Sequence, residues 1–125
     1  MIEPHYKVDQ RNNLIVADIS GDWDIQADIG YLTLLDEKMS IVRHAPWALV
    51  ADLRGWRVSK EIINLKHNHT IQLLRGHQVI ECWLVDDMQQ GQHIQHHVEN
   101  AGIPFYKCLH MTEVENYLKQ YGFHL

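Results

Sequence analysis

The chain has 125 residues, of which 46% are hydrophobic, enough to bury the core of one domain without a disulfide or a metal. The net charge is -5 and no run of basic side chains offers a path for a phosphate backbone, so nucleic acid is not an expected partner. The first residues lack the apolar core of a signal peptide, and no apolar stretch approaches the ~18 residues that span a bilayer. We therefore expect one cytoplasmic domain over residues 1–125, without an integral membrane segment.

The first third of the chain predicts a β-hairpin followed by a helix. Alternation over residues 6–10 and a β-rich run over 14–19 predict two antiparallel strands. Asp22 or Asp24 can accept hydrogen bonds from the N–H groups of a helix start, and the helix should end near Arg43. Apolar residues recur at helical spacing in this segment, namely Ile25, Ile29, Leu32, Met39 and Val42.

The middle of the chain predicts a parallel crossover. Residues 47–51 and 79–85 are apolar without alternation, which is typical of strands covered on both faces. Between them a helical pattern runs from about Ser59 to Arg75, and Gly76 follows where a left-handed cap is commonly needed. Two buried strands joined by a helix predict a right-handed connection between parallel neighbours.

Three further elements complete the chain. A polar helix is predicted over residues 88–100, and an alternating segment over 105–109 is typical of an edge strand. Thr112 and Glu115 form a capping-box pattern at the start of a final amphipathic helix. The order β-β-α-β-α-β-α-β-α predicts an α/β fold, with a single-layer, mixed, mostly parallel five-stranded sheet and about four helices.

The stretch Asp52-Leu53-Arg54-Gly55 closes the first buried parallel strand. Together with the element order, it resembles the STAS domain of anti-sigma-factor antagonists and, more closely, the SpoIIAA-like proteins, in which an Asp-Leu-x-Gly pattern ends this strand. The resemblance covers nearly the whole chain and implies a SpoIIAA-like fold. It also implies a non-enzymatic regulator that binds a protein partner, or a carrier of a lipid or other small apolar ligand.

Regulators of this family present a phosphorylatable Ser or Thr in the loop that follows the strand. Here Glu61 stands at the matching position, and Ser59 alone could substitute. A Ser before a helix is more often an N-cap whose hydroxyl oxygen accepts a backbone N–H. We expect a cap at Ser59 and retain a phosphosite as the alternative.

Ligands of largely parallel sheets bind beyond the carboxyl ends of the strands. In this chain aromatic and apolar side chains fall at those ends, together with carboxylates and an arginine that would orient a ligand. The sequence therefore predicts a binding rim for a protein partner or a small apolar ligand, formed by Trp23, Asp52, Arg54, Trp56, Asp86 and Met88.

Two other classes of function stay open. Carboxylates at the strand ends could hold Mg²⁺ in a small metal-assisted enzyme that uses Asp22, Asp52, Asp86 or Asp87. No familiar catalytic motif accompanies these acids, so we expect no catalytic residues and no cofactor. The third class is a structural homodimer formed through the last strand or the first helix, and we expect self-association in each case.

Ten histidines and two cysteines are the remaining candidates for special chemistry. His93, His96 and His97 share one flank of the third predicted helix, but no Glu or Cys completes a metal motif, so we expect a solvated flank. His67 and His69 should lie at the edge of a packed face, where charging in acid would loosen a contact. The cysteines should be reduced thiols in the core.

Overall fold

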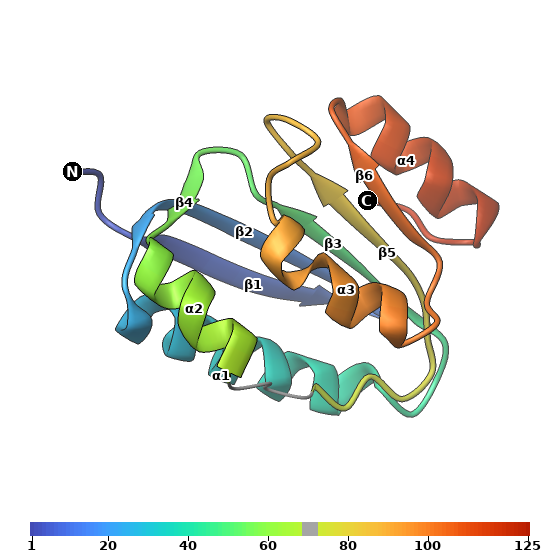
Figure 1. Cartoon of the computed structure of the whole chain (residues 1–125). Coiled ribbons are helices and arrows are strands. Elements are labelled where there is room, and N and C mark those ends of the chain that lie inside the picture. Colours follow the sequence, from blue (N-terminus) through green and yellow to red (C-terminus); the bar gives the residue numbers. More distant parts are fainter. Residues whose placement is uncertain (69–72) are drawn as a thin grey trace.

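The structure, a computed structural model, describes residues 1–68 and 73–125. Within these residues the chain has an α/β architecture, with helices on both faces of a mixed sheet (Figure 1). In chain order its elements are β1 (His5–Arg11), β2 (Leu14–Trp23), α1 (Ile25–Val42), β3 (Trp47–Asp52), β4 (Trp56–Val58), α2 (Lys60–Asn68), β5 (Gln78–Leu84), α3 (Gln92–Asn100), β6 (Phe105–Cys108) and α4 (Met111–Gln120).

The sheet is mixed and mostly parallel, as the sequence predicted. Strands lie in the order β1-β2-β3-β5-β6, with β1 antiparallel to β2 and the other neighbours parallel. The two segments without alternation, β3 and β5, occupy interior positions, and β6 is an edge strand. Among the described residues the sheet has six strands rather than five, because β4 pairs with β2.

The additional strand continues the line of β3 along the long strand β2. Pairing of β2 with β3 stops at Asp18 and Asp52, and pairing with β4 resumes at Gly21 and Trp56. The turn between β3 and β4 contains Gly55, whose φ of +78° is in the left-handed region that favours glycine. The Gly21 N–H donates to the Gly55 carbonyl at 2.9 Å, so this turn is fastened to β2.

Two hydrophobic cores lie on opposite faces of the sheet. Helices α1, α2 and α3 cover one face, and α4 covers the other (Figure 1). Because successive side chains of a strand point to opposite faces, Leu49 and Ala51 of β3 enter the first core, while Ala48 and Val50 enter the second. Every residue from Trp47 to Ala51 is consequently buried, which explains the missing alternation.

Helix α1 begins where the sequence predicted, and Met39 and Val42 of its predicted apolar set are buried, but the first turns bury other residues. Asp24 is the N-cap, and its Oδ1 accepts the Ala27 N–H at 2.8 Å. Ile25 and Ile29, which were expected in the core, are 43% and 55% exposed. The residues that α1 buries are Ala27, Asp28, Leu35, Met39 and Val42.

The boundaries of two other helices differ from the prediction. Helix α3 begins at Gln92 rather than Met88, because the Asp87 carboxylate accepts the N–H groups of Gln89 and Gln90 and folds this segment into a turn. Helix α4 begins at Met111, and its N-cap is His110. The backbone N–H of His110 donates to Oε1 of Glu113, three residues later, at 3.2 Å, which is the contact of a capping box. The capping box therefore lies at His110 and Glu113, and the prediction of Thr112 and Glu115 was wrong.

Helix α2 is described as far as Asn68. Its predicted continuation to Arg75 crosses residues 69–72, which lie outside the described residues and include His69. The predicted surroundings of the His67 side chain stay a prediction. Gly76 has a φ of +56° and lies in the turn before β5. No helix in the described part of the chain is both long and apolar enough to cross a membrane.

Candidate functional site

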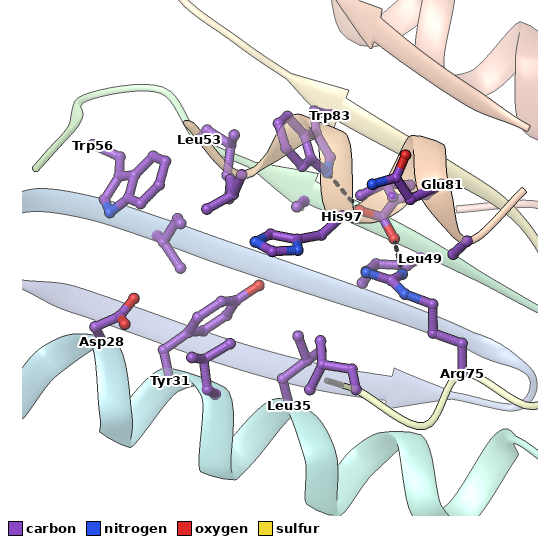
Figure 2. A pocket seen from close by; sticks show the side chains of 18 of the residues that line it. Asp28, Tyr31, Leu35, Leu49, Leu53, Trp56, Arg75, Glu81, Trp83 and His97 are labelled. Carbon is purple, nitrogen blue, oxygen red and sulfur yellow. Dashed lines mark hydrogen bonds and ion pairs between the residues drawn. The ribbon is translucent and has the colours of Figure 1, made fainter. Parts of the chain in front are cut away.

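A pocket of about 420 Å³ lies between α1, α3 and the helix-covered face of the sheet (Figure 2). Strands β2, β3 and β5 supply its floor, and α1 and α3 its sides. The lining is mainly aliphatic and aromatic and includes Ile19, Leu32, Leu35, Leu49, Ala51, Leu53, Trp56, Leu73, Trp83, Ile94 and Val98; the polar lining residues include Asp28, Tyr31, Arg75, Glu81 and His97.

Strand and helix periodicities bring these side chains together. Glu81 and Trp83 are two apart on β5, so both point to the face covered by α1 and α3. On α1, Asp28, Tyr31 and Leu35 follow one another at three and four residues and share one side of the helix. Strand β5 and helix α1 therefore each direct polar side chains into the same mostly apolar pocket.

A buried ion pair forms one wall of the pocket. Glu81 is 2% exposed, and its Oε1 accepts from Arg75 Nη1 at 2.6 Å and from Gln78 Nε2 at 3.0 Å. The second oxygen, Oε2, accepts the Trp83 indole N–H at 2.7 Å. A buried carboxylate is tolerated when an opposite charge and hydrogen bonds replace its water, and this wall supplies both. Figure 2 shows the Arg75 and Trp83 contacts as dashed lines.

Tyr31 brings its hydroxyl to the pocket from α1 (Figure 2). Burial raises the pKa of this phenol, and the negative charge of Glu81 raises it further. The hydroxyl therefore remains protonated across the physiological range. The Tyr31 ring packs edge-on against Trp23 at 5.5 Å, and Trp23 packs edge-on against Trp56 at 5.8 Å, which fixes the end of the pocket nearest β4.

Trp56 differs from the other tryptophans in its hydrogen bonding. Trp23, Trp47 and Trp83 each donate their indole N–H to an oxygen at 2.7 to 2.8 Å. Trp56 is only 5% exposed, yet its Nε1 has no hydrogen-bond partner among the described residues. A buried donor of this kind is uncommon in folded proteins, and it lies on a residue that lines the pocket.

The structure brings three of the predicted rim residues together. Arg54 donates to both carboxylate oxygens of Asp52, from Nε at 3.0 Å and from Nη2 at 2.8 Å. The hydrogen bond to Asp52, reinforced by its charge, raises the pKa of the Arg54 guanidinium. Asp86, at the end of β5, accepts the Gly55 N–H at 2.7 Å and so joins the ends of β3 and β5.

The other predicted rim residues occupy different environments. Trp23 and Trp56 are buried, whereas Met88 is 49% exposed. Of the predicted rim, Trp56 alone lines the pocket. Gln90 connects the rim to the pocket, since its Nε2 donates to the carbonyls of Leu53 and Trp56 at 2.6 and 3.1 Å. Ligand or partner binding by the rim stays a prediction.

Ser59 has the geometry of a helix cap. Its Oγ lies 3.4 Å from the Ile62 N–H at the start of α2, which is the contact that an N-cap hydroxyl makes. The side chain is also exposed. Phosphorylation of Ser59 stays a prediction.

The acids considered for a metal site have separate roles. Asp22 Oδ2 accepts the Ile2 N–H, Asp52 pairs with Arg54, and Asp87 shapes the turn after β5. In the described part of the chain, no three His, Cys, Asp or Glu side chains gather closely enough to hold a metal ion.

The histidine flank of α3 is less solvated than the sequence suggested. His96 is exposed, but His93 and His97 are half-buried. The His93 ring lies 5.6 Å from the Trp56 ring, and His97 lines the pocket. The prediction of a solvated flank on α3 was therefore confirmed only at His96.

Four residues of the pocket were not predicted as site residues from the sequence, namely Tyr31, Arg75, Glu81 and Trp83. One signal was present, because Glu81 is the single charged residue in the apolar run over 79–85. A carboxylate at the centre of a strand covered on both faces requires a buried partner. That partner, Arg75, could not be chosen from the sequence because it had been assigned to a helix end.

No protein-family model matches the chain, and no curated protein matches it significantly. An uncharacterised protein of the DUF3478 family with a SpoIIAA-like fold, from Shewanella loihica, is similar in structure, with a TM-score of 0.61 and 8% sequence identity over 94% of this chain and 95% of that one. An anti-sigma factor antagonist from Mycobacterium paratuberculosis aligns over 86% of this chain and 88% of its own, with 17% identity and a TM-score of 0.44. The chain is a sequence-divergent protein with a SpoIIAA-like fold, as its resemblance implied.

Proposed function

We propose that this protein is a non-enzymatic binding module that holds a small, largely apolar molecule in the pocket between α1, α3 and the sheet. The pocket itself carries the proposal. Protein interiors are packed as densely as organic crystals, whereas ligand pockets typically measure roughly 300–1,000 Å³. A space of about 420 Å³ with mostly apolar walls and a few buried polar groups fits a ligand site better than an ordinary core.

The polar groups of the pocket favour binding over catalysis. Both carboxylate oxygens of Glu81 are already engaged by Arg75, Gln78 and Trp83. Tyr31 has a raised pKa and so stays a neutral phenol rather than a base. These groups are suited to orienting a ligand, and the aliphatic side chains around them to burying it.

A second candidate function is the binding of a protein partner at the rim. The observation that favours it is the preorganised guanidinium of Arg54, which is held in two hydrogen bonds by Asp52 while its side chain stays 55% exposed. The exposed Met88 adds apolar surface at the same end of the sheet. Such a combination suits a protein surface that is read by charge and shape.

The pocket proposal can be tested with the neutral dye N-phenyl-1-naphthylamine, whose fluorescence rises in apolar surroundings. The wild-type chain should give a saturable increase. Ala101→Trp places a large ring at the pocket lining and should weaken binding by about tenfold or more, since the dye then loses the space it needs. Glu99→Trp adds the same ring to the exposed end of α3, outside the lining, and should bind like the wild type.

Two further variants separate the pocket from the rim. Arg54→Ala and Met88→Ala change exposed side chains that do not line the pocket, so both should bind the dye normally. Thermal melting would first establish that each variant is folded. The proposal fails if the wild type shows no saturable signal or if Ala101→Trp binds as tightly as Glu99→Trp.

We also propose a cytoplasmic location and self-association. The edge strand β6 has backbone groups open to a second copy, and α1 carries exposed apolar side chains at Ile25, Ile29 and Ile41. Sedimentation velocity over a range of concentrations would detect the dimer. A single monomeric species at every concentration would contradict the proposal of self-association.

A further inference from the structure

Trp56 lines one end of the pocket, and its indole N–H is buried. Figure 2 places its nitrogen on the side of the ring turned toward α1. The fold has already removed this donor from water and gives it no partner within the described residues. An acceptor brought by a ligand would therefore gain a hydrogen bond without the usual cost of desolvating the donor.

The charges around the pocket restrict what kind of acceptor can enter. Arg75 is the one lining residue of fixed positive charge in the described part of the chain, and Glu81 already holds it at 2.6 Å. Asp28, itself only 8% exposed, adds a second carboxylate to the lining. An incoming carboxylate would lose its water, and the one arginine that could compensate its charge is already paired with Glu81.

Tyr31 also favours an uncharged ligand over a carboxylate. Its hydroxyl points into the pocket, and the raised pKa keeps it a neutral donor rather than an anion. The lining thus presents neutral donors beside carboxylates. A neutral oxygen that accepts a hydrogen bond is the ligand group that such a lining accommodates.

We infer that the pocket selects an uncharged ligand bearing a carbonyl oxygen, such as a ketone, ester or amide, which accepts the Trp56 N–H. Such a ligand should bind more tightly than either the hydrocarbon or the carboxylate that has the same carbon skeleton. This inference rests on the proposed function, because it specifies the ligand of the same pocket.

Three naphthalene probes of matched shape test this selectivity: 2-acetylnaphthalene, 2-ethylnaphthalene and 2-naphthoate. Titrations of ¹⁵N-labelled protein would follow the indole N–H resonances, with the Trp56 signal identified by its loss in Trp56→Phe. The ketone should bind about tenfold or more tightly than the ethyl compound and move the Trp56 signal downfield. The carboxylate should bind at least about tenfold more weakly than the ketone.

Trp56→Phe keeps an aromatic ring and removes the N–H, so the preference for ketone over ethyl should disappear. Trp47→Phe is the matched control, because Trp47 does not line the pocket and its N–H is already donated to the Arg75 carbonyl, and the preference should persist. Equal binding of ketone and ethyl compound by the wild type would overturn the inference and leave the proposed function standing. Failure of all three probes to bind would overturn both.

Discussion

The buried ion pair between Arg75 and Glu81 gives the sharpest prediction about stability. The two side chains are 14% and 3% exposed, so the charges lie almost fully out of water. Arg75→Met retains most of the apolar stem and removes the guanidinium, leaving Glu81 with Gln78 and Trp83 as donors but without its opposite charge. Removal of one partner of a buried pair typically costs about 3–5 kcal/mol in the free energy of unfolding.

An exposed pair in the same molecule provides the control. Arg54 and Asp52 have side-chain exposures of 55% and 20%, and exposed pairs contribute about 0–1 kcal/mol. Arg54→Met should therefore change the unfolding free energy far less than Arg75→Met does. Urea denaturation at pH 7, followed by tryptophan fluorescence, measures both variants under the same conditions.

A second substitution tests the cause of the loss. Glu81→Gln, added to Arg75→Met, removes the uncompensated charge and keeps an oxygen that can accept the Trp83 N–H. The double variant should therefore be more stable than Arg75→Met alone. The reasoning is refuted if Arg75→Met loses less than about 1 kcal/mol or loses no more than Arg54→Met.

Gly91→Ala should destabilise the protein and weaken dye binding, because a Cβ there would lie 2.7 Å from the Trp83 ring. Gly102→Ala is the control, since Gly102 also has a positive φ but a Cβ there meets nothing within 4 Å. Equal losses of stability in urea denaturation would show that the contact with Trp83 does not cause the effect. Burial raises the pKa of Cys82 to about 12 and of Cys108 to about 11, above the ordinary value of 9.0. The unfolded chain then loses these protons first, so stability should fall as the pH rises above 9, by at most about 1.4 kcal/mol per pH unit for each thiol. Urea denaturation from pH 8 to 10.5 should show a shallower fall for Cys82→Ala/Cys108→Ala than for the wild type, and equal slopes would contradict it.

Much of the fold could be predicted because burial on both faces leaves a clear mark in the sequence. The apolar runs that became β3 and β5 were identified for this reason, and they set the parallel core of the sheet. Strand β4 was missed because three residues after Gly55 are too few to establish a period. Its existence depends on the far end of β2, a long-range pairing that local pattern does not contain.

The candidate site was harder to predict than the fold. In α1, apolar residues occur on more than one side, so the sequence favoured Ile25 and Ile29 as core residues while the structure buries Asp28 and Leu35. Trp56 was correctly placed near the strand ends, but its orphan N–H depends on neighbours that only the folded chain assembles. Local rules thus located one edge of the pocket and missed the groups that line its interior.

The most direct test of the pocket is the location of a bound probe. Nuclear Overhauser effects between N-phenyl-1-naphthylamine and the labelled chain should connect the dye to Leu35, Leu49 and Val98, which come from α1, β3 and α3 and meet in the pocket lining. Contacts confined to exposed side chains such as Ile29 and Met88 would contradict the account, because they would place the dye on the surface rather than between the helices and the sheet.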